Sequence, residues 1–219
     1  MDVLLGALLG LSAGFQHAFE PDHLAAVSTL VTEKRSPRSG LLYASLWGMG
    51  HASMLLLFGG ALLVFRPVLS QRWDARFELC VGVVLIALGL RAVQSFRRTQ
   101  DGTHSHGALT HSHAPSNADK SRGEKKLAVR SLGVGLLHGL AGSGALTALV
   151  IAKRWESAKG LLFMGLFGLG ATLGMAVLGG IFGYTLFRVA RSGGAFRFVS
   201  LAAGILSLAI GFVWIGKNI

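Results

Sequence analysis

Six apolar stretches divide the chain, and each is long enough to cross the hydrocarbon core of a membrane. A helix needs roughly 20 apolar residues to span a core of about 30 Å. The stretches cover 3–31, 40–65, 77–96, 129–152, 160–187 and 196–216. Only 14% of the residues are charged, whereas soluble domains carry about 25%. The sequence therefore predicts an all-α polytopic membrane protein with six transmembrane helices.

Composition excludes several other classes of protein. The 31 glycines follow no three-residue period, which excludes collagen. The single cysteine, Cys80, excludes a disulfide framework and a CxxC redox pair. A net charge of +11 would indicate nucleic acid as the partner of a soluble protein. Here the basic residues lie between apolar stretches, so we expect the lipid bilayer as a partner and no nucleic acid.

The basic residues also predict an orientation. Fourteen Lys and Arg fall in loops on one side of the predicted spans and 7 on the other. The positive-inside rule places the richer side in the cytosol, so both termini face outward. Most of this excess comes from the long loop after 77–96, without which the counts are 7 and 6. The chain opens Met1-Asp2 without a basic segment, so we do not expect a cleaved signal peptide.

The two halves of the chain resemble each other. Gly40-Leu-Leu-Tyr-Ala-Ser-Leu-Trp-Gly-Met-Gly50 aligns with Gly160-Leu-Leu-Phe-Met-Gly-Leu-Phe-Gly-Leu-Gly170, and matches also lie upstream and downstream. The glycines of these segments would allow close helix approach. Three spans per copy make a 3+3 inverted repeat, which is common in secondary transporters. We predict repeats at 1–96 and 128–219, joined by a His-rich, disordered cytosolic loop at 97–127.

A polar cluster interrupts the first predicted span. It reads His17-Ala-Phe-Glu-Pro-Asp-His23. Ionisable groups within a span are expensive and usually functional. Two imidazoles and a carboxylate form a metal-ligand set that suits Ni, Co, Cu, Zn or Fe. Pro21 cannot donate to the His17 carbonyl, so a break there could turn His17 and Asp22 inward and expose carbonyl oxygens. Two roles stay open for Glu20: it could carry a proton or ion along the path, or it could be a charge at a helix end.

Two further histidines lie in other predicted spans. His51 stands in a glycine-flanked helix and is a candidate ligand from the second span. His138 matches His17 in the repeat, although its half lacks the other ligands, since Asp22 aligns with Ser143. We therefore expect an asymmetric site built mainly by the first half. His138 and Ser143 are candidates for a ligand or pathway role, with a packing role as the alternative.

The long loop contains two His-x-His pairs. They consist of His104, His106, His111 and His113. Histidines on a flexible tether suggest loose metal capture, and a solvated linker is the alternative.

These motifs resemble a known family. His17-x4-Asp22-His23 resembles the HX4DH signature of the nickel/cobalt transporter (NiCoT) family, and Gly50-His51-Ala-Ser53 resembles its second histidine motif. Gly135-Leu-Leu-His138-Gly-Leu-Ala-Gly-Ser143 is similar to a segment of the short UreH-type urease accessory permeases. The resemblance implies that His17, Asp22, His23 and His51 recognise Ni2+ or Co2+. Typical members have eight spans, which is more than this chain has.

Together these features predict a secondary permease rather than an enzyme. Ni2+, or Co2+, would be the transported substrate and no cofactor would stay bound. Uptake through a bacterial cytoplasmic membrane is the favoured direction, with supply to a nickel enzyme such as urease. Three alternatives stay open: a nickel/cobalt efflux permease, a sulfite-type anion exporter and a membrane metalloenzyme. The oligomeric state is not predicted.

Overall fold

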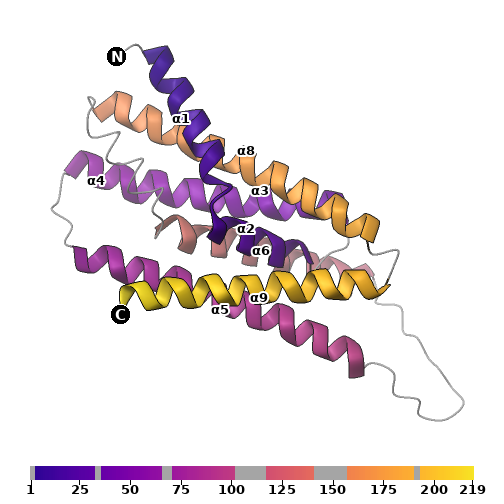
Figure 1. Ribbon diagram of the computed structural model, residues 1–219. Helices are drawn as coiled ribbons and strands as arrows, with labels where there is room; N and C mark the ends of the chain where they lie inside the picture. Colours follow the sequence, from indigo (N-terminus) through magenta and orange to yellow (C-terminus); the bar gives the residue numbers. More distant parts are fainter. Residues whose placement is uncertain (1–2, 33–35, 66–70, 102–116, 141–156, 190–192) are drawn as a thin grey trace, which may run out of the picture.

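All regular elements in the described part of the chain are helices. The computed structural model describes residues 3–32, 36–65, 71–101, 117–140, 157–189 and 193–219. The helices are α1 (Val3–His17), α2 (Pro21–Thr32), α3 (Pro37–Met54), the π-helical turn η1 (Leu55–Gly59), α4 (Gly60–Phe65), α5 (Gln71–Asp101), α6 (Asn117–Leu140), α8 (Ser157–Val189) and α9 (Gly193–Asn218) (Figure 1).

Four of the described helices are long and apolar enough to cross a membrane. They cover Pro37–Leu63, Ala75–Gln94, Ala158–Arg188 and Arg197–Asn218. The pair Val3–His17 and Pro21–Thr32 passes the same test together and is bent by 61°, which gives up to five spans. These ranges follow the predicted stretches closely, so the prediction of a helical membrane protein is confirmed.

Two predicted segments are only partly described. Of the predicted span 129–152, the structure describes 129–140, at the end of α6. Of the expected loop 97–127, α5 covers 97–101 and α6 covers 117–127, so helix extends into both ends of the segment. The four histidines of that loop lie outside the described residues.

The short helix α2 occupies the centre of the bundle. It packs against α3, α5, α8 and α9, which run side by side along the length of the molecule (Figure 1). Most of its side chains are buried, including Asp22, His23 and Leu30. Both chain ends lie at the same end of the bundle (Figure 1). The first turn of α2 therefore places polar side chains deep inside a helical protein.

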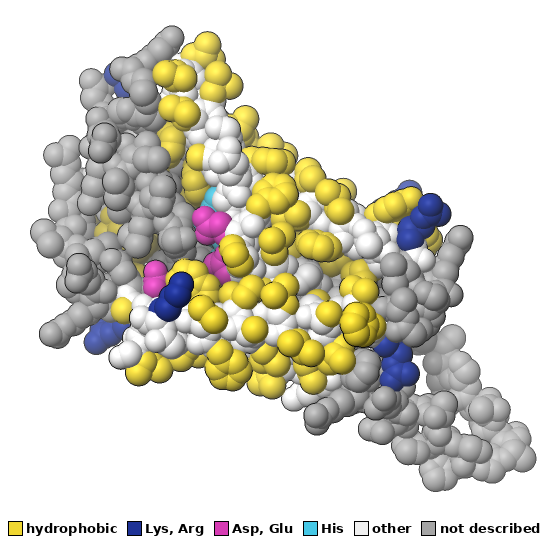
Figure 2. Space-filling model, viewed as in Figure 1, with side chains coloured by type: hydrophobic (Ala, Val, Ile, Leu, Met, Phe, Trp, Pro, Cys, Tyr) yellow, Lys and Arg dark blue, Asp and Glu magenta, His cyan; other side chains and the backbone are white. Residues whose placement is uncertain are grey.

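The outer face of the bundle is apolar. Figure 2 shows hydrophobic side chains along the lengths of the helices and Lys and Arg toward the two ends. Large apolar side chains point outward on several helices, among them Leu57, Ile181 and Phe212, which are 70%, 56% and 62% exposed. Such a surface suits hydrocarbon, and basic side chains suit the boundaries with water.

Glycines bring two pairs of helices to backbone contact. A Cβ at Gly14 of α1 would collide with the carbonyl group of Phe167 in α8. A Cβ at Gly135 of α6 would collide with the carbonyl group of Trp47 in α3. The contact of α6 with α3 thus repeats that of α1 with α8, and only glycine permits either approach.

Helices α5 and α9 pack through reciprocal glycines. A Cβ at Gly82 would lie 2.9 Å from the Gly211 oxygen, and one at Gly211 would lie 2.8 Å from the Gly82 oxygen. Seven residues along each helix, Gly89 and Gly204 meet in the same reciprocal manner. At the same interface the buried Ser207 hydroxyl donates to the carbonyl oxygen of Leu85 at 2.9 Å. Small residues permit such close packing where lipid offers no hydrophobic drive between helices.

The helix that carries His51 changes its winding immediately after that residue. Helix α3 ends at Met54, and a π-helical turn from Leu55 to Gly59 leads into α4. The aligned stretch of the second half lies within α8, which is α-helical throughout from Ser157 to Val189. Single π turns inside helices are frequent at functional sites.

A pair of glycines on α8 tests the packing. Gly170→Ala should lower stability by about 1–3 kcal/mol, the usual effect of overpacking, because its Cβ would collide with the Leu11 carbonyl oxygen. Gly165→Ala on the same helix should be neutral or stabilising by about 0.5–1 kcal/mol, since no neighbouring described atom lies within 4 Å of that Cβ position. Thermal unfolding in detergent measures both, and equal effects would contradict the packing.

Candidate metal centre

The break between α1 and α2 places His17 and His23 on either side of a sharp bend. Helix α1 ends at His17 and α2 begins at Pro21, with an angle of 61° between them. Proline suits the first helical position, where an amide hydrogen has no partner in the helix. The His17 carbonyl oxygen, to which Pro21 cannot donate, accepts the amide of Glu20 at 3.0 Å instead. The tight turn satisfies the backbone locally.

One face of α1 leads to the site. Gly6, Gly10, Gly14 and His17 are its buried residues, and they recur every three or four positions, as one helical face requires. Gly10 and Gly14 let α1 lie close to α8, and His17 follows at the end of the same line. Helix α6 has an equivalent line in Ser131, Gly135 and His138. In both α1 and α6 the buried face thus ends in a histidine, close to the last described residue of the helix.

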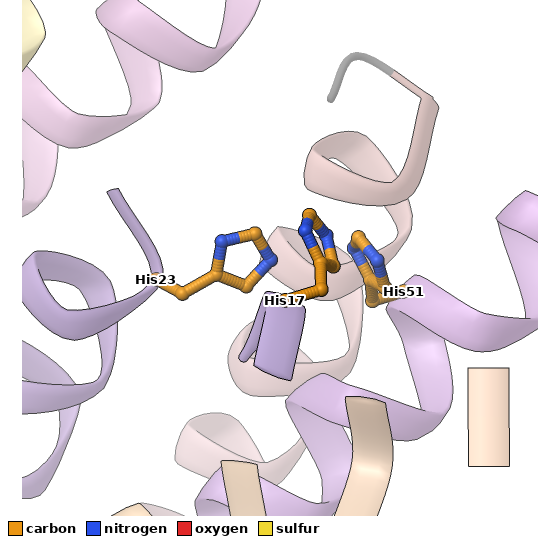
Figure 3. A group of neighbouring side chains, drawn as sticks. All are labelled: His17, His23 and His51. Carbon is orange, nitrogen blue, oxygen red and sulfur yellow. The ribbon is translucent and has the colours of Figure 1, made fainter. Parts of the chain in front are cut away.

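Four buried imidazoles meet at the end of these lines. His17, His23, His51 and His138 are each less than 5% exposed. The ring centroid of His23 lies 4.3 Å from that of His17, 5.2 Å from that of His51 and 4.5 Å from that of His138. Figure 3 shows the rings of His17, His23 and His51 converging, with the outer end of the His23 ring directed at the other two.

Asp22 contacts two of these imidazoles. Its Oδ1 lies 2.9 Å from Nδ1 of His23, and its Oδ2 lies 3.2 Å from Nε2 of His138. Oδ1 also accepts the backbone amide of His23 at 2.9 Å. A carboxylate in this position fixes the orientation and tautomer of a metal-binding imidazole and raises its basicity. Asp22 also brings a full negative charge to a buried place, which a cation would neutralise.

Glu20 lies at the edge of the cluster. Its Oε1 is 2.9 Å from Nδ1 of His17, and its side chain is 37% exposed while that of His17 is 3% exposed. Figure 2 shows acidic side chains and a histidine at the surface beside the bend between α1 and α2. Glu20 therefore connects the buried imidazoles with the outside of the described protein.

Two aromatic residues that no sequence motif indicated complete the cluster. Phe167 of α8 packs on His17 at 5.3 Å between ring centroids, and Trp47 of α3 packs on His138 at 5.4 Å. Trp47 also lies 5.3 Å from His23 and is fully buried. The repeat alignment contained the signal, since Trp47 and Phe167 occupy equivalent positions in the two copies.

The arrangement can hold a divalent transition metal in two overlapping ways. One ligand atom from each of His17, His23 and His51 lies within 4.8 Å of the others, and the same holds for Asp22, His23 and His138. Both nitrogens of His51 and Nε2 of His23 are buried without a hydrogen-bond partner in the described residues. Buried polar atoms are normally satisfied, so such atoms fit ligands that a metal would complete.

The other predicted site residues cannot be placed relative to this cluster, because they lie outside the residues that the structure describes. Ser143 lies outside the described residues. The same is true of the loop histidines, which are His104, His106, His111 and His113.

Comparison with known proteins gives three relatives. The chain is 39% identical over 178 residues to the urease accessory protein UreH of Bacillus sp. (strain TB-90), which covers 80% of this chain and 75% of that protein. It is 35% identical over 95 residues to a high-affinity nickel transport protein of Cupriavidus necator, covering 42% of this chain and 27% of that protein.

A third relative comes from a plant. The chloroplast protein FOR GROWTH AND FERTILITY 2 of Arabidopsis thaliana is 26% identical over 179 residues, covering 80% of this chain and 46% of that protein. No family model matches the chain. No solved structure matches it either.

The contacts of Asp22 predict its effect on metal binding. Asp22→Asn removes the buried charge and leaves an amide beside His23, so affinity for Ni2+ should fall about 10- to 100-fold, as when other partners of ligating histidines are lost. Titration of the purified protein with Ni2+ measures the affinity. Glu78→Gln in α5, the same chemical change in another span, should leave it unaltered. Equal effects of the two substitutions would contradict the assignment.

Proposed function

The chain belongs to the nickel/cobalt transporter family, among its UreH-type permeases, and we propose that it carries Ni2+, and also Co2+, across a membrane. The similarity to UreH over most of both chains places it in the family. This confirms the resemblance that the HX4DH-like segment at His17 indicated. A nickel transport protein among its relatives supports the substrate.

The main support for this proposal is that four imidazoles and one carboxylate are buried next to one another. Imidazole suits Ni2+ and Co2+, whereas Mg2+ and Ca2+ take oxygen ligands. The nitrogens available on His23 and His51 can replace water around the entering ion, and Asp22 offsets one of its two charges. In a medium of low dielectric constant this attraction is much larger than in water. The ion passes through as substrate and no metal stays as a cofactor.

We propose that the chain is a 3+3 inverted repeat that works by alternating access. The contacts between helices support this. Gly170 meets the carbonyl oxygen of Leu11 as Gly50 meets that of Leu132, and Gly48 meets Thr172 as Gly168 meets Ala52. Each pair maps onto the other under the alignment of the two halves. In such transporters one repeat rocks against the other around a site near the midplane, and His51 lies near the middle of Pro37–Leu63.

We further propose that transport runs as uptake into the cytosol. An inward-negative potential favours entry of a doubly charged cation by about 4.6 kcal/mol per 100 mV, so uptake needs no coupled ion. The side richer in Lys and Arg, with the His-rich segment, faces the cytosol of a bacterial cell. His104, His106, His111 and His113 would capture the released ion loosely. Glu20 and Ser143 would line the path, and a nickel enzyme such as urease would receive the metal.

Reconstituted protein tests the activity. Liposomes that contain the purified protein and a trapped Ni2+ indicator should take up Ni2+, and an inside-negative potassium diffusion potential should speed the uptake. His17→Ala and Asp22→Asn should abolish it, because the first removes an imidazole of the cluster and the second removes the charge of its carboxylate. Ser207→Ala, which removes a buried hydroxyl between α5 and α9, should transport like the unaltered protein.

Two outcomes would decide against parts of this proposal. Full transport by both His17→Ala and Asp22→Asn would reject the site. Cells that contain less nickel when they express the protein would show efflux in place of uptake.

The topology has a separate test based on the single cysteine. With Cys80 changed to Ala, one new cysteine is placed at Gly123 or at Ile219, which is 96% exposed. A membrane-impermeant maleimide should label Ile219→Cys on intact cells and label Gly123→Cys only after the cells are opened. The opposite pattern would invert the orientation, and labelling of both on intact cells would contradict the proposed number of crossings between them.

A further inference from the structure

The side chain of His23 belongs to both groups of metal-ligand atoms. The group of His17, His23 and His51 consists of three imidazoles, whereas the group of Asp22, His23 and His138 includes a carboxylate. The ring of His23 contacts members of both groups, at 68° to the ring of His17 and 86° to the ring of His138. The two groups share His23 and differ in all their other ligands, so they define two overlapping positions for an ion.

The two nitrogens of His23 have different surroundings. Nδ1 lies 2.9 Å from the Asp22 carboxylate, and Nε2 has no hydrogen-bond partner in the described structure. Figure 3 shows the end of the ring away from its attachment pointing toward His17 and His51. One ring thus offers a nitrogen to each group.

The surroundings of His17 and His138 are equivalent by the internal repeat. Each follows a glycine in contact with a carbonyl of the opposite half, Gly14 with Phe167 and Gly135 with Trp47. In each case the aromatic residue that provides this carbonyl also packs on the histidine. The ring centroids of Phe167 and His17 are 5.3 Å apart, and those of Trp47 and His138 are 5.4 Å apart. The two halves therefore present one matching imidazole each, and both imidazoles pack against the ring of His23.

We propose that these groups are two successive stations for the transported ion and that His23 is their shared ligand. The inference rests on the proposed nickel transport. The ion enters the station of His17, His23 and His51 and then exchanges His17 and His51 for Asp22 and His138. The ring proton of His23 moves to the nitrogen that the ion leaves, so the ring stays neutral and no net proton is gained or lost.

The shared ligand has a clear physical advantage. A dication between two separate buried sites would lose all protein ligands where little water is available to replace them. A ligand common to both stations removes that intermediate. The carboxylate of the second station attracts the ion from the first, which has no formal charge. As the repeats rock, the station nearer one half opens to one side and the other station to the opposite side.

Separate loss of each station distinguishes two stations from one. His51→Ala removes a ligand of the first station only, His138→Ala removes one of the second only, and His23→Ala damages both. Purified full-length variants are titrated with Ni2+, and their imidazole ligands are counted by X-ray absorption. The two single-station variants should each bind one Ni2+ within about tenfold of the unaltered affinity, and His23→Ala should lose more than about 100-fold, beyond the loss expected for an outer partner alone.

Transport completes the test. His51→Ala and His138→Ala should bind Ni2+ and yet carry it at least about tenfold more slowly, a rise in barrier of about 1.4 kcal/mol. His138→Gln keeps more of the side-chain volume than alanine does, so it separates loss of the ligand from misfolding. Ser207→Ala is the matched control, because it removes a buried polar group elsewhere in the bundle.

Three outcomes overturn the inference. Unimpaired transport by His138→Ala and His138→Gln removes the second station. Equal and large losses of binding in the His23, His51 and His138 variants indicate one common site. Three imidazole ligands in His51→Ala would show that the remaining histidines bind one ion together, which excludes two stations. If the unaltered protein moves no Ni2+, the proposed function fails, and the binding pattern still decides whether two stations exist.

Discussion

Backbone contact at glycines determines how close the imidazoles of this protein can come. Gly14 and Gly135 bring α1 onto α8 and α6 onto α3, and each contact lies one helical turn before a histidine. A side chain at either glycine would push its helix outward and move the imidazole with it. In a membrane no hydrophobic effect pulls helices together, so close packing supplies the association. The cluster of imidazoles therefore depends on the smallest residues in the chain.

The interruption at Pro21 complements these contacts. A continuous helix would place His17 and Asp22 on different faces, about 140° apart by the α-helical period. The 61° bend lets α2 enter the bundle as a buried central helix, with Asp22 and His23 in its first turn. Because Glu20 donates its amide to the His17 carbonyl, this oxygen has a partner within the turn. The bend thus brings Asp22 and His23 to the cluster without leaving the His17 carbonyl unpaired.

Much of this could be read from the sequence, for identifiable reasons. Hydropathy located up to five of the six predicted spans because lipid constrains helix length. The His17 to His23 segment indicated the candidate site because ionisable groups are rare in spans. The association of His138 with Asp22 depends on how α6 packs against the rest of the bundle, which spacing along the chain does not determine. Trp47 was missed because a buried aromatic residue in a span is ordinary, until its ring is seen against His23 and His138. The hydrogen bond from Glu20 to the His17 carbonyl could not be predicted, because it depends on the turn that residues 18–20 form.

The π-helical turn after His51 limits the likeness of the two halves. The aligned stretch of α8 is regular α-helix, and Ala171 stands where the first half has His51. A π turn rises less per residue and is rare as a regular structure, so the halves differ in winding as well as in ligands. If the halves exchange roles when access alternates, no symmetry makes the two end states equal in energy. The asymmetry of the chain itself then biases its resting state, before any ion or voltage acts on it.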